Sequence, residues 1–227
     1  MTRAAFVVLA TAIAVVCAAT IDAQSRRAVP RTPIRTIQPA DVTCSAPLGT
    51  GTATGRQFCD VPAGREAKEG IIVRLPPRRG IATLTFDLHN RHTYSAEEER
   101  SGQAYRRYTA TIGVLTLDNT LLSRFVVRNE FRRASDLFDR VSGGSGVGGV
   151  KAVAPTGVES VAIDIPDAID AVSILGEKEL VVAAQAGPPE IHMAPGRPVA
   201  VVSQIMVEYT PAPKPAKKPV RRRSSRG

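Results

Sequence analysis

Residues 108–131 (YTATIGVLTLDNTLLSRFVVRNEF) constrain the fold more than any other stretch of the chain. From Tyr108 to Val114 every second residue is apolar or aromatic, which is the pattern of a half-buried β-strand. Leu115 and Leu117 then move the apolar positions to the other face, which indicates a β-bulge near Gly113 or burial on both faces.

The second half of this stretch predicts the partner strand. Asp118 and Asn119 tolerate the positive φ that a tight hairpin turn requires. Residues 121–131 place apolar side chains on one face and mostly charged side chains on the other. A shift of one residue would put those charges in the core, so the pattern predicts a β-hairpin with a well-specified register.

Similar patterns recur along the chain and are separated by Gly and Pro. The further strands that we predict are residues 71–75, 82–88, 158–165, 168–175, 180–184 and 200–209. About eight strands with almost no helix favour an all-β fold, an antiparallel β-sandwich of the jelly-roll or immunoglobulin-like type. The chain has no Trp, so the Cys…Trp…Cys signature of a true immunoglobulin domain is missing. We assign one domain to residues 42–209.

In this even run of short strands, residues 70–209 resemble the jelly-roll carbohydrate-binding modules of secreted bacterial proteins. The resemblance lies in the architecture and includes no diagnostic motif. It implies a β-sandwich with a glycan-binding surface. The missing Trp departs from that family, whose aromatic residues stack on sugar rings.

The first 23 residues are typical of a secretory signal peptide. Arg3 precedes the nearly uncharged apolar run 4–20, which is short for a membrane span. We place cleavage after Ala23, with Ala19 as the second choice, and keep an uncleaved anchor as an alternative. Residues 24–41 are polar, basic and rich in Pro, which predicts a flexible lead-in. We expect export to the periplasm or the extracellular space.

Two cysteines remain after removal of the signal, Cys44 and Cys59. Two cysteines at this separation in an exported chain predict a disulfide. A redox or metal-binding pair is the alternative, but the spacing does not match C-x-x-C.

Most of the net charge of +9 comes from the C-terminal end of the chain. Residues 42–209 hold 18 Lys+Arg and 19 Asp+Glu, a net charge of −1. The segment 210–227 has the composition of a disordered tail, and its cations are Lys214, Lys217, Lys218, Arg221, Arg222, Arg223 and Arg226. We expect these residues to contact a polyanion or glycan of the cell envelope, while export argues against nucleic acid. An inert tail that only keeps the protein in solution is the alternative.

Residues 90–107 join two predicted strands and are long for a hairpin connection, which is typical of functional loops. Ser95 to Glu98 fits a capping box, so we expect a short helix there. The ligand-binding candidates combine aromatic rings with polar groups that suit a sugar. They are Tyr94, Tyr105, Arg106, Arg107 and Asp87. Packing of the tyrosines at the sheet edge is the alternative.

Signals for cofactor chemistry are weak. His89 and His92 at a strand end are metal-ligand candidates, but nothing fixes a third ligand and HExxH is absent. The formal G-x-G-x-x-G at residues 144–149 lacks the following helix of a dinucleotide site, and we interpret it as a flexible linker. We therefore predict no cofactor and assign neither catalytic residues nor a metal site.

These patterns favour an exported, non-catalytic β-sandwich that binds a glycan or another part of the cell envelope. The alternative is a small secreted hydrolase that uses carboxylates or a histidine-bound metal. That alternative requires Asp87, His89 and His92 to converge with an acid of the 90–107 loop. A structural domain within a larger assembly is a third hypothesis.

Overall fold

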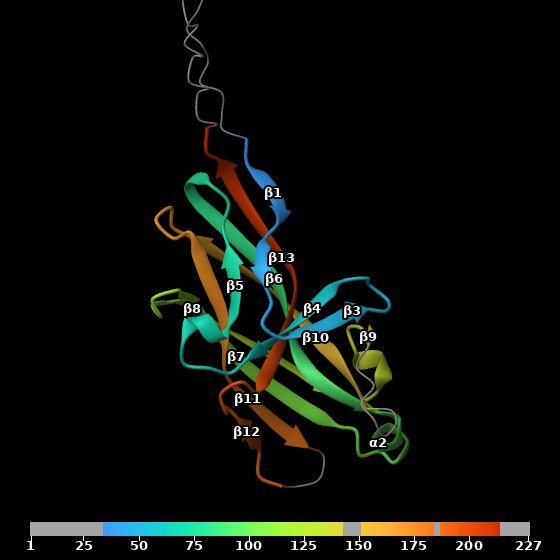
Figure 1. Ribbon diagram of the computed structural model, residues 1–227. Helices are drawn as coiled ribbons and strands as arrows, with labels where there is room; N and C mark the ends of the chain where they lie inside the picture. Colours follow the sequence, from blue (N-terminus) through green and yellow to red (C-terminus); the bar gives the residue numbers. More distant parts are fainter. Residues whose placement is uncertain (1–33, 143–150, 184–186, 214–227) are drawn as a thin grey trace, which may run out of the picture. The chain divides into compact units, whose positions relative to one another are not determined.

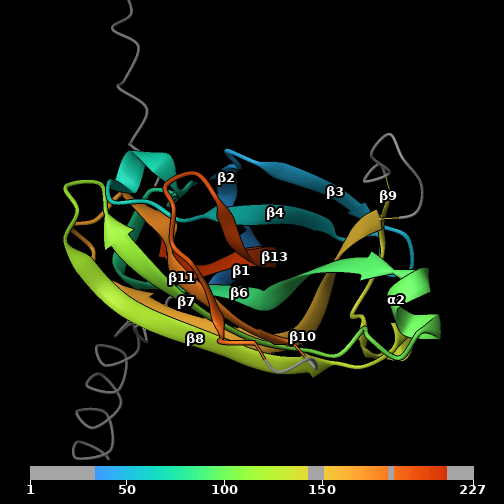
Figure 2. The ribbon, with the colours of Figure 1, turned by 90° about the horizontal axis from the view of Figure 1, so that it is seen from below.

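The computed structural model describes residues 34–142, 151–183 and 187–213, which form two antiparallel β-sheets packed as a sandwich (Figures 1 and 2). Sheet A has the order β10-β6-β13-β4-β3-β9, and β1 also pairs with β13. Its strands are β1 (Thr36–Pro39), β3 (Pro47–Gly51), β4 (Gln57–Pro62), β6 (Arg78–Ser95), β9 (Val141–Ser142), β10 (Lys151–Ile165) and β13 (Pro198–Pro211).

Sheet B has the order β2-β5-β11-β7-β8, and β12 also pairs with β11. Its strands are β2 (Asp41–Thr43), β5 (Ile71–Arg74), β7 (Arg106–Thr116), β8 (Leu121–Phe131), β11 (Ala171–Ala183) and β12 (Glu190–His192). The helical elements in the described residues are η1 (Ala67–Glu69), α2 (Ala96–Arg100) and η2 (Ala134–Asp136). The predicted all-β sandwich is confirmed. The predicted strands 168–175 and 180–184 form the single strand β11, and the strands that were not predicted are short. No helix within the described residues has the length and apolar character needed to cross a bilayer.

The predicted hairpin is present as β7 and β8. Its register runs from the pair Arg106↔Phe131 to the pair Leu115↔Leu121. A bulge lies where the register shifts between Val114 and Leu115, close to the predicted position, and Asn119 has a φ of 68° in the turn.

Aliphatic side chains fill the space between the two sheets, as expected for a chain without Trp. Leu84, Ile112 and Ile174 have no exposed surface, and Phe86 is also buried in the same cluster. The inward faces of β6, β7 and β11 therefore meet in one core, which anchors both sheets.

Cys44 and Cys59 form the predicted disulfide, with a Cα–Cα distance of 6.1 Å. Cys44 directly follows β2 of sheet B, whereas Cys59 lies on β4 of sheet A. The bond therefore links the segment that leads from sheet B to sheet A with a strand of sheet A. A disulfide is consistent with an oxidising compartment outside the cytoplasm.

Two segments differ from the sequence-based expectations. β1 lies within residues 24–41, where we expected a flexible lead-in, and it pairs with β13 although Ile37 is largely exposed. Backbone hydrogen bonds, rather than side-chain burial, therefore hold it. β6 continues to Ser95, whereas the sequence predicted a loop from residue 90, and the expected short helix follows directly as α2.

The predicted signal peptide (residues 1–23), the glycine-rich segment 144–149 and the tail cations from Lys214 to Arg226 lie outside the described residues.

Candidate functional site

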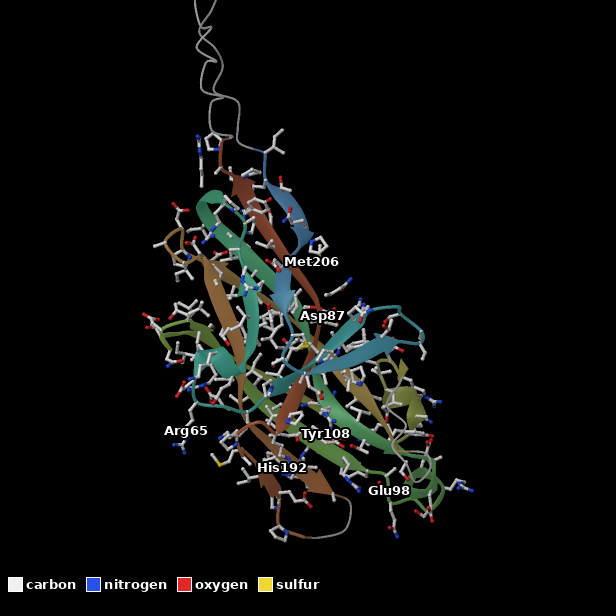
Figure 3. The ribbon with its side chains drawn as sticks, in the orientation of Figure 1. Arg65, Asp87, Glu98, Tyr108, His192 and Met206 are labelled. Carbon is white, nitrogen blue, oxygen red and sulfur yellow. A yellow bond between two sulfur atoms is a disulfide. The ribbon has the colours of Figure 1, made fainter. Side chains whose placement is uncertain are left out.

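A polar cavity lies between the two sheets where β6 extends beyond β13. The ladder between these strands ends at the pair Val201↔His89, while β6 continues to Ser95 and pairs there with β10. A cavity of about 440 Å³ fills this region, and we call it the polar cavity. Its walls consist of Arg91, Thr93, Glu98, Arg106, Tyr108, Glu179, Val181, His192, Arg197 and Pro198. Figure 3 shows Tyr108, His192 and Glu98 toward the same end of the sandwich.

Glu179 on β11 is the most unusual residue of this wall. The register between β11 and β7 shifts between Gly176 and Lys178, and beyond this bulge Glu179 pairs with the fully buried Ala110. Directly opposed residues share a face, so the carboxyl group points to the interior. Only 6% of Glu179 is exposed, and its Oε1 has no hydrogen-bond partner among the residues that the structure describes. Burial raises the pKa of Glu179 to about 7, although Arg91 and Arg197 act in the opposite direction.

Next to this carboxyl, Tyr108 and His92 form a buried pair across the sandwich. The Tyr108 hydroxyl lies 2.6 Å from His92 Nδ1, and the imidazole stacks on Phe131 with 3.7 Å between ring centroids. Burial and then the charge of Arg106 lower the pKa of His92 to about 4, so the ring is neutral at neutral pH. Burial, followed by the charge of Glu179, raises the pKa of Tyr108. These two side chains form a neutral, buried pair, of which Tyr108 lines the cavity.

Two of the three arginines of the cavity are paired with acids. Arg91 binds Asp60 on β4 at 3.1 Å, and Arg106 binds Glu98 on α2 at 3.2 Å. Burial raises the pKa of Asp60 in spite of this contact, because the carboxylate is removed from water.

Arg197 completes the cationic part of the wall. Its Nη2 lies 3.1 Å from His192 Nε2, which is also 3.3 Å from a Glu190 oxygen. The lining thus combines three arginines with the carboxyl groups of Glu98 and Glu179.

Of the five predicted ligand-binding residues, only Arg106 lines the polar cavity. Arg107 is its neighbour on β7 and therefore points to the opposite face of sheet B. Tyr94 donates a hydrogen bond to Glu99, and Tyr105 is bonded to the Glu130 carboxylate.

Asp87 lies in a different part of sheet A, where it accepts hydrogen bonds from Arg56 at 2.7 Å and Ser160 at 2.9 Å (Figure 3). The five residues therefore do not form one binding surface.

The two histidines considered as metal ligands are also separated. His92 bonds to Tyr108, whereas His89 lies on the other face of sheet A and bonds to Gly157 and Ser203. Across residues 34–142, 151–183 and 187–213, no group of three or more His, Cys, Asp or Glu side chains is arranged to hold a metal ion.

The sequence analysis missed Glu179, Arg91 and Arg197. A signal for Glu179 was present, because this acid lies two residues before Val181, on the same face of a strongly apolar strand. The bulge after Gly176 decides which face it occupies, and the sequence does not reveal that bulge. Arg91 and Arg197 approach Glu179 only through the pairing of distant strands.

Comparisons with known proteins provide no family. No family model matches the chain, and no curated protein matches it. Among solved structures, it is similar to the catalytic domain of a GH87 alpha-1,3-glucanase in complex with nigerose, with 10% identity, a TM-score of 0.29 and coverage of 83% of this chain and 30% of that chain.

A second similarity is to the infectious bursal disease virus VP2 subviral particle, with 12% identity, a TM-score of 0.23 and coverage of 82% and 37% of the two chains. The chain thus spans about a third of the length of either structure. We base no functional conclusion on such low TM-scores.

Proposed function

We propose that the protein is an exported β-sandwich module whose polar cavity is non-catalytic and binds a neutral, hydroxyl-rich ligand such as a glycan end. The observation that carries this proposal is the wall itself, in which the buried Glu179 carboxyl lies among three arginines. The volume of about 440 Å³ falls within the range of roughly 300–1,000 Å³ for small-molecule sites.

The chemistry of the wall favours hydroxyl groups. A sugar hydroxyl donates one hydrogen bond and accepts others, so guanidinium donors next to carboxylate acceptors satisfy it fully. Arg91 and Arg106 already have acidic partners, so a strongly anionic ligand would leave charges unbalanced away from water. The ring of Tyr108 is too buried to stack on a sugar, and recognition therefore depends on polar contacts.

A glycan array followed by calorimetric titration of the hits tests this proposal. Glu179→Gln should weaken binding at least tenfold, or about 1.4 kcal/mol, because an amide replaces the carboxylate acceptor. Glu177→Gln is the matched control, since Glu177 lies two residues away on β11 and pairs with Arg124 outside the cavity.

A second matched pair is Arg106→Ala and Arg107→Ala, which remove neighbouring arginines from opposite faces of β7. Only the Arg106 change should weaken binding. If no glycan binds, or if all four variants bind as the wild type does, the proposal is wrong.

A carboxylate-dependent hydrolase is the second candidate, because the pKa of about 7 would let Glu179 act as a general acid near neutral pH. Glu98, which is ion-paired with Arg106, is the second carboxylate of the cavity. Release of new reducing ends from a bound glycan, lost in Glu179→Gln and declining above pH 7, would favour the hydrolase. Binding without product would favour the module.

Contact of the basic tail with anionic envelope surfaces is a separate part of the proposal. Its support is the seven cations of residues 210–227. Deleting these residues should reduce binding to envelope fractions at low salt. Equal binding without them would show that the tail does not contribute to binding.

A further inference from the structure

Ser203 on β13 and His89 on β6 form a hydrogen-bonded pair away from the polar cavity. His89 Nε2 lies 3.0 Å from Ser203 Oγ, and His89 Nδ1 lies 2.6 Å from the Gly157 carbonyl oxygen. A carbonyl only accepts, so Nδ1 must carry the proton and Nε2 must accept from the serine hydroxyl. This order of nucleophile, base and orienting group is the arrangement that activates a serine.

The pair is shielded from water on one side. Phe58 and Phe138 pack against the His89 ring, with centroid distances of 5.7 and 4.5 Å. His89 has no exposed surface and Ser203 is 1% exposed. A reactant must therefore approach Ser203 along β13 rather than across the ring of His89.

Such an approach exists, because Ser203 lines a second cavity of about 430 Å³. The register of β13 is interrupted between Ser203 and Met206, and Gln204 has a positive φ of 52°. The other lining side chains are mostly apolar and include Pro39, Val42, Phe58, Val202, Ile205 and Met206. We call this space the apolar cavity, and it shares no lining residue with the polar cavity.

We propose that Ser203 is a nucleophile and His89 its general base, and that they hydrolyse an ester whose small uncharged acyl group occupies the apolar cavity. Ser203 Oγ bonds to the acyl carbon while its proton passes to His89 Nε2. The carbon–oxygen bond to the alcohol breaks, and the alcohol leaves with that proton. Water then gives a proton to Nε2 and its hydroxyl to the acyl carbon, which releases the acid and returns the proton to Ser203.

Burial favours the base form of His89 against the net effect of its polar neighbours. Burial lowers the pKa of His89, and the positive charge of Arg56 acts in the same direction. The Gly157 carbonyl and Asp87 act in the opposite direction. Asp87 is itself held by Arg56 and Ser160, so its negative charge is partly compensated. The imidazole is thus already neutral at pH 7 and needs no higher pH to act as a base.

Diisopropyl fluorophosphate and p-nitrophenyl acetate are the probes for this pair. Peptide mapping by mass spectrometry should locate the phosphoryl adduct on Ser203 of the folded full-length protein. The rate of labelling should be nearly constant from pH 7 to 9, whereas an unassisted hydroxyl reacts faster as the pH rises. Hydrolysis of p-nitrophenyl acetate should fall at least tenfold in Ser203→Ala.

Ser135→Ala is the matched control, since Ser135 is an exposed serine of η2 that lines neither cavity, and its rates should equal those of the wild type. Adduct mapping on the wild type decides the proposal even where Ser203→Ala fails to fold. A folded wild type without an adduct on Ser203, or with labelling that rises steadily from pH 7 to 9, would overturn it. Either result leaves the glycan proposal untouched, because the two cavities are separate.

Discussion

Replacing Glu179 by Gln should make the protein more stable while it weakens ligand binding. The carboxyl group has a usual pKa of 4.5 and a pKa of about 7 in the fold, where burial disfavours its charge. At 1.36 kcal/mol per pH unit, this difference costs the folded state ~3 kcal/mol once the group is ionised. Gln has nearly the same shape and carries no charge, so it avoids that cost.

The sign of the effect depends on pH. Below pH 4.5 the carboxyl is protonated in both the folded and the unfolded state, so wild type and variant should be equally stable. Between pH 4.5 and about 7 only the unfolded chain loses the proton, and the stability of the wild type therefore declines. Above pH 7 the advantage of the variant should level off at ~3 kcal/mol.

Urea unfolding followed by circular dichroism at pH 4, 6 and 8 measures this difference. The Glu177→Gln change, at a partly exposed surface ion pair, should alter the free energy of unfolding by less than about 0.5 kcal/mol at each pH. A Glu179→Gln variant that is less stable than the wild type at pH 8 would refute the burial of the carboxyl. The same difference in the free energy of unfolding at all three pH values would also refute it. A gain in stability with a loss of binding is the expected behaviour of a site that maintains a desolvated polar group.

Further predictions concern stability. The pKa of about 4 for His92 means that the wild type loses stability as the pH falls from 6.5 toward 4, because the unfolded chain takes up the proton first. His92→Gln should remove ~2–3 kcal/mol of this loss, which urea unfolding at pH 7 and at pH 4 measures. Reduction of the Cys44–Cys59 disulfide should lower the free energy of unfolding by about 3 kcal/mol, and a change below about 0.5 kcal/mol would contradict its role. Asp139 accepts hydrogen bonds from the backbone amides of Ala53, Thr54 and Arg140, so Asp139→Ala should cost about 2–3 kcal/mol in thermal melts, and an unchanged melting temperature would contradict this account.

The strands that the sequence predicted well are those in which side-chain burial and turn chemistry agree. The hairpin of β7 and β8 combines strict alternation with a turn at Asn119, and both signals are local. The end of β6 was missed because Asn90 and His92 are polar residues at inward positions. They are tolerated there because Asn90 donates to the Val127 carbonyl and His92 bonds to Tyr108, and these partners are distant in sequence.

The candidate site was beyond prediction for a similar reason. Arg91, Glu179 and Arg197 belong to β6, to β11 and to the residue just before β13, and only the packing of the two sheets brings them together. The predicted candidates were chosen because they are close in sequence. Neighbours on a strand point to opposite faces, so Arg106 reached the cavity and Arg107 did not.

Carbon-13 NMR titration of the Glu179 carboxyl, with and without a glycan hit, tests the polar cavity most directly. The account predicts a midpoint near pH 7 in the free protein and a changed midpoint when the glycan is bound. A midpoint near 4.5 would show that the carboxyl is solvated, and a midpoint that saturating glycan leaves unchanged would show that the ligand binds elsewhere.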